Sequence, residues 1–298
     1  MSKTLLITGA SGFVGRHLKK YMEEKGYSVL GLDINGKAEI NGDITDSSFV
    51  FETLAKEEFD YVIHLAALTN IKQTTEDPYS TYKVNSFGTL NLLELAYKKQ
   101  VSMFIYASSA NVYGKPLELP VTEQTPFNPR LPYDYSKVIS EKMVRSYQLH
   151  KGLRAAITRT WLLFGEGEPE TRAVPRFVRS CFKNDKIPLY NSGRDVTDPT
   201  YVLNYCRAVE LIMQSEKAVG EAFNIGSGSK MSIREMAERI KEITGSKAEL
   251  ELLPPRTELE KEPQISYPSL EKIEKLLGYK TMVSFEDGIR RVIKYYSG

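Results

Sequence analysis

Short apolar runs alternate with longer amphipathic segments through the first half of this 298-residue chain. The apolar runs predict strands at residues 5–8, 29–33, 61–65, 103–107 and 154–160. The amphipathic segments predict helices at 12–25, 47–56, 80–99 and 134–151. A parallel sheet covered by helices on both faces requires this alternation. The predicted fold class is therefore α/β, with a doubly wound parallel sheet.

The second half of the chain has a different texture. Past Gly165 the segments are charged and interrupted by proline, as in Leu253-Pro-Pro-Arg256. Such irregular backbone suits a smaller lobe whose loops contact a ligand. Residues 222–225 nevertheless predict a strand that returns to the main sheet, so the lobes are expected to interleave. The expected division is a main domain at 1–164, with a returning segment at about 196–226, and a mainly substrate-binding α/β lobe at 165–298.

Charge and composition narrow the classes of partner. The chain has 40 basic and 38 acidic residues and no basic block, which argues against nucleic acid or an anionic membrane as main partner. Two distant cysteines and three scattered histidines offer no ligand spacing, so no metal site is expected. The N-terminus runs directly into a predicted strand, and no apolar run is long enough to span a membrane. A cytoplasmic protein is expected.

A glycine-rich turn joins the first predicted strand to the first helix. Gly9, Gly12 and Gly15 are spaced three apart, and this turn would leave backbone N–H groups free at the helix N-terminus, where a pyrophosphate can bind. Such turns also serve as plain connections. Here, however, Asp33 ends the second predicted strand, where a carboxylate accepts from an adenosine ribose and repels a 2′-phosphate. The sequence therefore predicts a Rossmann-type dinucleotide site that favours NAD over NADP.

Tyr133 and Lys137 lie four residues apart at the start of a predicted helix, hence on one face. A nearby ammonium is expected to lower the tyrosine pKa, so that the phenol can serve as acid or base. The same spacing recurs at ordinary helix positions, namely Tyr21/Lys25, Tyr79/Lys83 and Tyr147/Lys151. Tyr133 differs because hydroxyl groups, Ser109 among them, follow a predicted strand shortly before it. Ligands bind beyond the carboxyl ends of such strands.

At these residues the chain resembles the extended short-chain dehydrogenase/reductase family, in its nucleotide-sugar epimerase, reductase and dehydratase branch. The resemblance extends over nearly the whole chain. It includes the glycine turn, Asn41-Gly-Asp43-Ile44, His64-Leu-Ala-Ala67, Asn85-Ser-Phe-Gly88, the Ser109/Tyr133/Lys137 set, Arg194-Asp195, Phe223-Asn-Ile-Gly226-Ser-Gly228 and Leu276-Leu-Gly278-Tyr279.

The resemblance implies NAD as cofactor and a nucleoside-diphosphate sugar as substrate. Ser109, Tyr133 and Lys137 would be catalytic. The implied cofactor contacts are Gly9, Gly12, Phe13, Val14, Gly15, Asp33, Asp43, Ile44, Leu65, Ala66, Ala67, Asn85, Tyr133, Lys137 and Thr160. The implied substrate contacts are Thr69, Ser109, Trp161, Leu162, Arg194 and Arg256. The two arginines would bind the diphosphate, the alternative for each being a solvated surface charge.

Departures from the family pattern reduce the number of reactions that the chain is expected to catalyse. Leu162 replaces a usual substrate-facing asparagine. Ala110-Asn111 stands where dehydratases carry Asp-Glu, so water elimination lacks its acid and base. Decarboxylases need a glutamate at Asn111, and fucose-synthase-like reductases need a cysteine near Ser109, and both are missing.

The function predicted from these residues is NAD-dependent epimerisation at C4 of a nucleoside-diphosphate hexose through a 4-keto intermediate. A 4-keto-6-deoxy-sugar reductase is the alternative, and a preference for NADPH would distinguish it. A non-catalytic NAD-binding regulator is disfavoured because Ser109, Tyr133 and Lys137 are all present. The resemblance also implies a homodimer through a four-helix bundle of helices 80–99 and 134–151. Its expected apolar stripe is Leu92, Leu95, Ala96, Val138, Ile139 and Met143.

Overall fold

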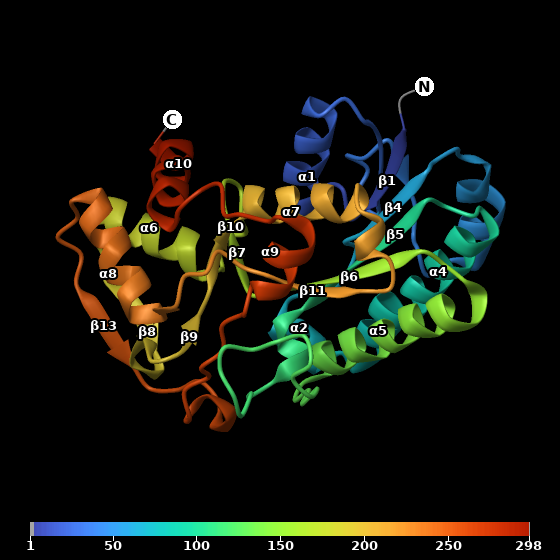
Figure 1. The fold of residues 1–298 in the computed structure, drawn as a ribbon. Coiled ribbons are helices and arrows are strands. Elements are labelled where there is room, and N and C mark those ends of the chain that lie inside the picture. The colour runs from blue at the N-terminus through green and yellow to red at the C-terminus, as the bar shows by residue number, and fades with distance from the viewer. Residues whose placement is uncertain (1–2, 298) are drawn as a thin grey trace.

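The computed structural model describes residues 3–297. Its centre is a parallel seven-stranded sheet in the order β11-β6-β5-β4-β1-β2-β3 (Figure 1). The strands are β1 (Thr4–Thr8), β2 (Ser28–Asp33), β3 (Ile40–Asn41), β4 (Tyr61–His64), β5 (Met103–Ser109), β6 (Ala155–Thr160) and β11 (Ala222–Ile225). The inner strands are buried on both faces, which explains why they are apolar along their length. The predicted doubly wound α/β class is confirmed.

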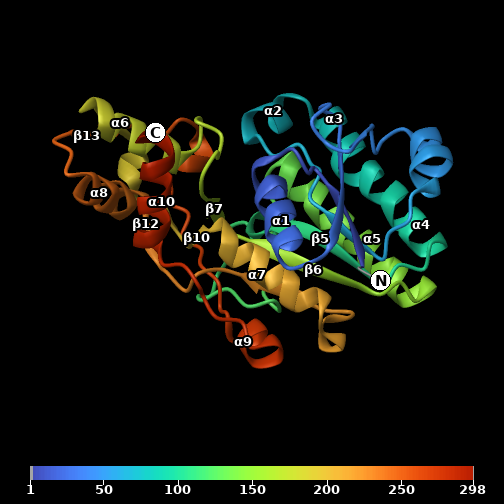
Figure 2. The same cartoon turned by 90° about the horizontal axis from the view of Figure 1, so that it is seen from above.

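Helices cover both faces of the sheet. Helices α1 (Phe13–Glu24) and α7 (Val202–Met213) pack side by side on one face, as Figure 2 shows. Helices α4 (Thr89–Lys98) and α5 (Pro132–Lys151) cover the other. Each face buries its own apolar core against the central strands.

A second, smaller group of elements packs around a third apolar core. Its helices are α6 (Ala173–Lys183), α8 (Ile233–Thr244) and α10 (Phe285–Ser297). Three short strand pairs accompany them: β7 (Leu162–Phe164) with β10 (Pro199–Tyr201), β8 (Ile187–Tyr190) with β13 (Leu250–Leu253), and β9 (Val196–Thr197) with β12 (Met231–Ser232). The remaining helices are α2 (Ile71–Glu76), α3 (Pro78–Tyr82) and α9 (Glu271–Leu277). Strand β11, predicted to return, pairs with β6.

Two predicted helices are irregular in the structure. Segment 80–99 consists of α3, a π-helical turn (Lys83–Gly88) and α4. The turn ends at Gly88, where a side chain would strike the buried Ile44. Segment 47–56 forms a π-helical turn (Phe49–Thr53) followed by a 3₁₀ turn (Leu54–Lys56).

The predicted apolar stripe for a dimer is partly wrong. Leu92, Leu95 and Ala96 are buried in the core against the sheet, because this is the face that α4 turns towards the strands. Tyr135 and Ile139, one turn apart on α5, are 46% and 42% exposed.

Candidate functional site

The glycine turn lies at the carboxyl end of β1. Gly9 has φ +72°, and a Cβ there would lie 2.8 Å from the backbone N of Ala66. At Gly15 a Cβ would lie 2.1 Å from the Gly9 carbonyl oxygen, so α1 starts against the turn only with glycine. Gly12 precedes α1 without a capping side-chain hydrogen bond. The first N–H groups of α1 therefore receive no side-chain cap from Gly12, which suits a phosphate ligand.

Two side chains at this turn also suit a dinucleotide. Asp33, at the end of β2, accepts a hydrogen bond from the Ser11 N–H at 3.0 Å and so lies against the turn. The Ser11 hydroxyl oxygen is buried and has no hydrogen-bond partner among residues 3–297. A buried hydroxyl without a partner, beside a helix N-terminus without a side-chain cap, is what a phosphate-bearing ligand would satisfy. The residues present therefore fit NAD.

The segments after β2 and β4 complete this edge of the sheet. Asp43 accepts from the Thr45 N–H at 2.8 Å, and Ile44 is buried. Leu65, Ala66 and Ala67 follow β4 and are half-buried. Leu68, the residue after Ala67, is held by the buried side chain of Asn85. The Leu68 N–H donates to Asn85 Oδ1 at 2.8 Å, and Asn85 Nδ2 donates to the Leu68 carbonyl oxygen at 3.0 Å. Asn85 thus fixes the position of the chain beyond Ala67.

Ser109, Tyr133 and Lys137 line one cavity of about 230 Å³. Other residues that the sequence assigned to the site also line it: Phe13, Val14, Leu65, Thr69, Thr160 and Trp161. They follow β1, β4 and β6 or end those strands, as expected for a ligand crevice at the carboxyl edge of the sheet. Lys137 Nζ donates to the Ala107 carbonyl oxygen at 2.7 Å and lies 5.9 Å from the Tyr133 ring centroid.

The electrostatics of this cavity differ from the sequence-based expectation. Burial raises the pKa of Tyr133 above its ordinary value, while the Ser109 hydroxyl and the Arg172 charge act in the opposite direction. The expected lowering of the pKa of Tyr133 by Lys137 is therefore wrong for the protein chain alone. Burial lowers the pKa of Lys137 itself to about 8, opposed by the Glu141 carboxylate.

A larger cavity of about 650 Å³ adjoins the first, because Ile71 and Asn111 line both. Arg256 lines it and donates to both carboxylate oxygens of Glu260 at 3.0 and 3.1 Å through Nε. Arg194 is exposed, and its guanidinium donates to Asn191 and to the Lys261 carbonyl oxygen. Of the two arginines assigned to the diphosphate, only Arg256 is among the residues that line this cavity.

Leu162 requires a correction. It packs against the apolar core of the smaller lobe, whereas the next residue, Leu163, lines the small cavity. The reason is the alternation of side chains along β7, which places neighbours on opposite faces. Leu162 is therefore not among the residues that line the small cavity, where the resemblance implies a substrate contact for it.

Sequence reasoning missed two arginines. Arg172 lines the small cavity and acts on Tyr133, and Arg130 lines the larger one, where it donates to Gln264 Oε1 at 2.8 Å. Arg130 precedes Tyr133 by three residues, and this proximity was its only signal in the sequence. Arg172 lies in an irregular segment without a motif.

Within residues 3–297, no group of three or more His, Cys, Asp or Glu side chains could hold a metal ion. The described helices include none long and apolar enough to cross a membrane.

Comparisons with known proteins agree with this geometry. The family model described as "NAD dependent epimerase/dehydratase family" matches residues 5–226. The "Putative UDP-glucose 4-epimerase" of Methanocaldococcus jannaschii is 32% identical and is covered over 97% of its length by 98% of this chain.

Solved structures give the same result. The UDP-glucose 4-epimerase of Thermotoga maritima, solved with UDP-glucose, superposes with a TM-score of 0.92 at 26% identity, covering 99% of this chain and 98% of that one. A dTDP-glucose 4,6-dehydratase of Streptomyces venezuelae, solved with NAD bound, gives 0.89 at 26% identity, with 99% and 97% covered.

Proposed function

The chain belongs to the NAD dependent epimerase/dehydratase family, and we propose that it is an NAD-dependent epimerase that inverts C4 of a nucleoside-diphosphate hexose. One observation carries the proposal. Ser109, Tyr133 and Lys137 line the same cavity as Phe13 and Val14 of α1, next to the glycine turn, so a hydroxyl-bearing carbon can meet acid–base groups beside the cofactor site.

The glycine turn and Asp33 would hold NAD, which would supply the acceptor for the hydride of C4 and the donor that returns it. Tyr133, as phenolate, takes the proton of the C4 hydroxyl as the keto group forms, and returns it as the keto group is reduced. Ser109 donates a hydrogen bond to the C4 oxygen through both steps. Because burial raises the pKa of Tyr133, the phenolate depends on a neighbouring cation such as Arg172 while Ser109 donates to the C4 oxygen. The keto sugar turns about its diphosphate bonds between the two steps.

The residue after Ala110 favours epimerisation over elimination. Asn111 lines both cavities, and its amide can hydrogen-bond a sugar but cannot remove a proton from carbon. Loss of water from a 4-keto sugar needs such a base and an acid for the leaving hydroxyl. At positions 110 and 111, where dehydratases carry this acid and base, the chain has alanine and asparagine, which supports return of the hydride to C4.

Cofactor and substrate are held at opposite ends of the site. Asp33 lies where it can accept from both adenosine ribose hydroxyls of NAD. Arg256 would contact the diphosphate from the larger cavity, sharing its charge with Glu260. For Arg194 the same role requires its guanidinium to leave Asn191.

We also propose that two copies associate through α5 and its neighbours. The exposed Tyr135 and Ile139 form an apolar patch on one face of α5, and a twofold dimer needs only one self-complementary patch.

The proposal is tested by denaturing purified protein and identifying the released dinucleotide and sugar nucleotide. NAD is expected, together with turnover of a UDP-hexose when no reduced cofactor is added. NADPH as the bound species, with turnover only when it is supplied, would favour a 4-keto-6-deoxy-sugar reductase instead. Tight NAD binding without conversion of any sugar nucleotide would indicate a non-catalytic protein.

A further inference from the structure

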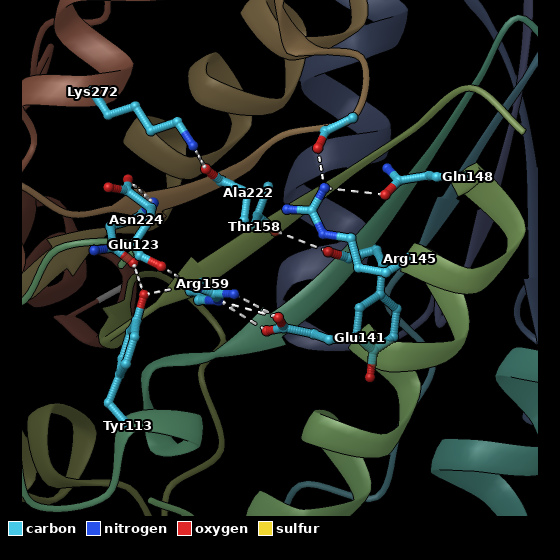
Figure 3. Close-up of polar contacts among 12 residues, drawn as sticks. Tyr113, Glu123, Glu141, Arg145, Gln148, Thr158, Arg159, Ala222, Asn224 and Lys272 are labelled. Carbon is cyan, nitrogen blue, oxygen red and sulfur yellow. Dashed lines mark hydrogen bonds and ion pairs between the residues drawn. The ribbon is translucent and has the colours of Figure 1, made fainter. Parts of the chain in front are cut away.

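A buried ion pair lies between the helix that carries Tyr133 and the strand beside it (Figure 3). The Arg159 and Glu141 side chains are only 5% and 3% exposed. Arg159 Nε donates to Glu141 Oε1 at 2.9 Å, and its terminal nitrogen Nη2 donates to Oε2 at 2.7 Å. This two-pronged contact fixes the angle between guanidinium and carboxylate as well as their distance.

The remaining edge of the guanidinium contacts a third segment. Arg159 Nη1 donates to the Tyr113 hydroxyl at 2.7 Å and to the Glu123 carbonyl oxygen at 3.2 Å. The Tyr113 hydroxyl in turn donates to Asn224 Oδ1 at 2.7 Å. The Tyr113 ring stacks on Trp161 with centroids 6.0 Å apart and planes at 24°. Every polar group in this chain of contacts has a partner.

Three of the segments that meet at Arg159 also line the small cavity: α5, the 3₁₀ turn after Ser109, and the end of β6. Glu141 is one helical turn beyond Lys137 and two beyond Tyr133 on α5. Tyr113 ends the 3₁₀ turn (Ala110–Tyr113) that begins directly after Ser109. Arg159 itself immediately precedes Thr160 and Trp161. One guanidinium therefore connects the segments that carry Tyr133, Ser109 and Trp161.

We propose that Arg159 and Glu141 are positioning residues that hold Tyr133 and Lys137 at a fixed distance from Ser109. The proposal rests on the function proposed above, and extends it to residues that touch neither substrate nor cofactor. Stability alone does not account for the pair, because replacing a buried ion pair with apolar side chains of similar size is often neutral or stabilising. Rate is sensitive to placement, since an error of about 1 Å can cost a hundredfold.

The pair also affects the charge of Lys137. The Glu141 carboxylate raises the pKa of Lys137 against the larger, opposite effect of burial. The other titratable groups near Lys137 are Tyr133 on α5, Tyr106 on β5 and His64 on β4, and burial keeps the pKa of His64 low, at about 3. Among these groups, Glu141 is therefore the one whose charge favours the protonated form of Lys137.

The test uses an apolar replacement of the whole pair, Arg159→Met with Glu141→Leu, in the full chain with NAD. Its Tm is expected to stay within a few degrees of the wild type, with kcat lower by roughly ten- to a hundredfold and KM changed less than about threefold. The matched control is Arg154→Met with Glu216→Leu, an exposed ion pair at the start of the same strand, which should leave kcat unchanged. A double variant with wild-type kcat overturns the proposal.

If the double variant does not fold, Tyr113→Phe tests the same point, because it keeps the ion pair and removes the hydrogen bonds of the Tyr113 hydroxyl to Arg159 and Asn224. A lower kcat at constant KM supports the proposal, and wild-type kinetics overturn it.

A second readout needs no substrate. Lysine labelled with ¹³C at Cε reports the pKa of Lys137 by NMR, with Lys137→Met providing the assignment. Glu141→Gln should lower this pKa from about 8, and the Arg154/Glu216 control should not. An unchanged value overturns the action of Glu141 on Lys137. If the wild-type protein has no epimerase activity, the proposed function is wrong. The NMR titration of Lys137 then still tests whether Glu141 acts on it.

Discussion

At the scale of single residues, the chemistry depends most on Tyr133, which is 8% exposed and faces the cavity beside Ser109. The motif made its place in the sequence predictable. Its pKa was not predictable, because the burial that raises it comes from segments distant in sequence. Arg172 was missed because it is distant from Tyr133 in the sequence, and only the fold brings it to the same cavity. Leu162 was misassigned because family position does not reveal which face of a three-residue strand meets the cavity.

Tyr133→Phe removes one hydroxyl and no apolar contact, so folding and NAD affinity should be nearly unchanged. Turnover should fall by about a hundred- to ten thousandfold, the usual contribution of a general acid–base group. Tyr135→Phe, two residues along the same helix and half exposed, is the control and should retain full activity. A Tyr133→Phe enzyme with more than about a tenth of wild-type activity would contradict the assignment.

The pKa of Lys137 has a consequence for stability. The folded protein releases the Lys137 proton at about pH 8, whereas the unfolded chain holds it up to the ordinary pKa of 10.5. Between these values the unfolded state binds more protons, so the free energy of unfolding, relative to Lys137→Met, should rise with pH by at most about 1.4 kcal/mol per pH unit. Urea denaturation of both proteins from pH 7 to 10 measures this. A difference that does not change with pH would contradict the lowered pKa of Lys137.

At the scale of elements, six of the seven strands of the main sheet were predicted, since burial on both faces makes most of them continuously apolar, and the two-residue strand β3 was not. Strand β11 has the predicted bounds. The short pairs β7–β10, β8–β13 and β9–β12 were not predicted, because most of these strands have only two or three residues and all lie in the irregular, charged half of the chain. The π-helical turn before α4 was also missed; it ends at Gly88, which lies against Ile44, far away in the sequence.

Gly15→Ala tests the junction of α1 with β1. Its Cβ would meet the Gly9 carbonyl oxygen at 2.1 Å and the Ala10 Cα at 2.7 Å, so α1 must shift. We expect a loss of about 1–3 kcal/mol in the free energy of unfolding, together with weaker NAD binding, measured by denaturation and calorimetry. Gly36→Ala, whose Cβ would have its nearest atom 3.8 Å away, should change neither. If the two variants had the same free energy of unfolding and the same NAD affinity, the predicted clash at Gly15 would be wrong.

At the scale of the whole molecule, the two cavities are bordered by segments whose proximity could not be predicted from the sequence. Gln264 donates to the Gly114 carbonyl oxygen, and Ser266 accepts from Trp161 Nε1 at 2.9 Å, across more than a hundred residues of chain. Their neighbours in sequence contain no motif, so only the folded structure shows that residues 262–268 cross the site. The division at 1–164 and 165–298 and the dimer stay predictions.

The dimer is tested at the exposed face of α5. Ile139→Glu places a charge in the proposed interface, and it should give a monomeric mass by light scattering at micromolar concentration, with NAD affinity retained. Leu149→Glu, on the same helix and 78% exposed, is the control for a charge outside the Tyr135–Ile139 patch. A wild-type protein that is already monomeric would rule the dimer out.

The fate of the hydrogen at C4 tests epimerisation most directly. UDP-glucose, UDP-N-acetylglucosamine and UDP-glucuronate, each deuterated at C4, are incubated with the protein without reduced cofactor and followed by NMR and mass spectrometry. The account predicts that one of them gives its C4 epimer with deuterium still at C4 and no loss of mass. Deuterium at C6 with loss of water, or no epimer from any of the three, would contradict it.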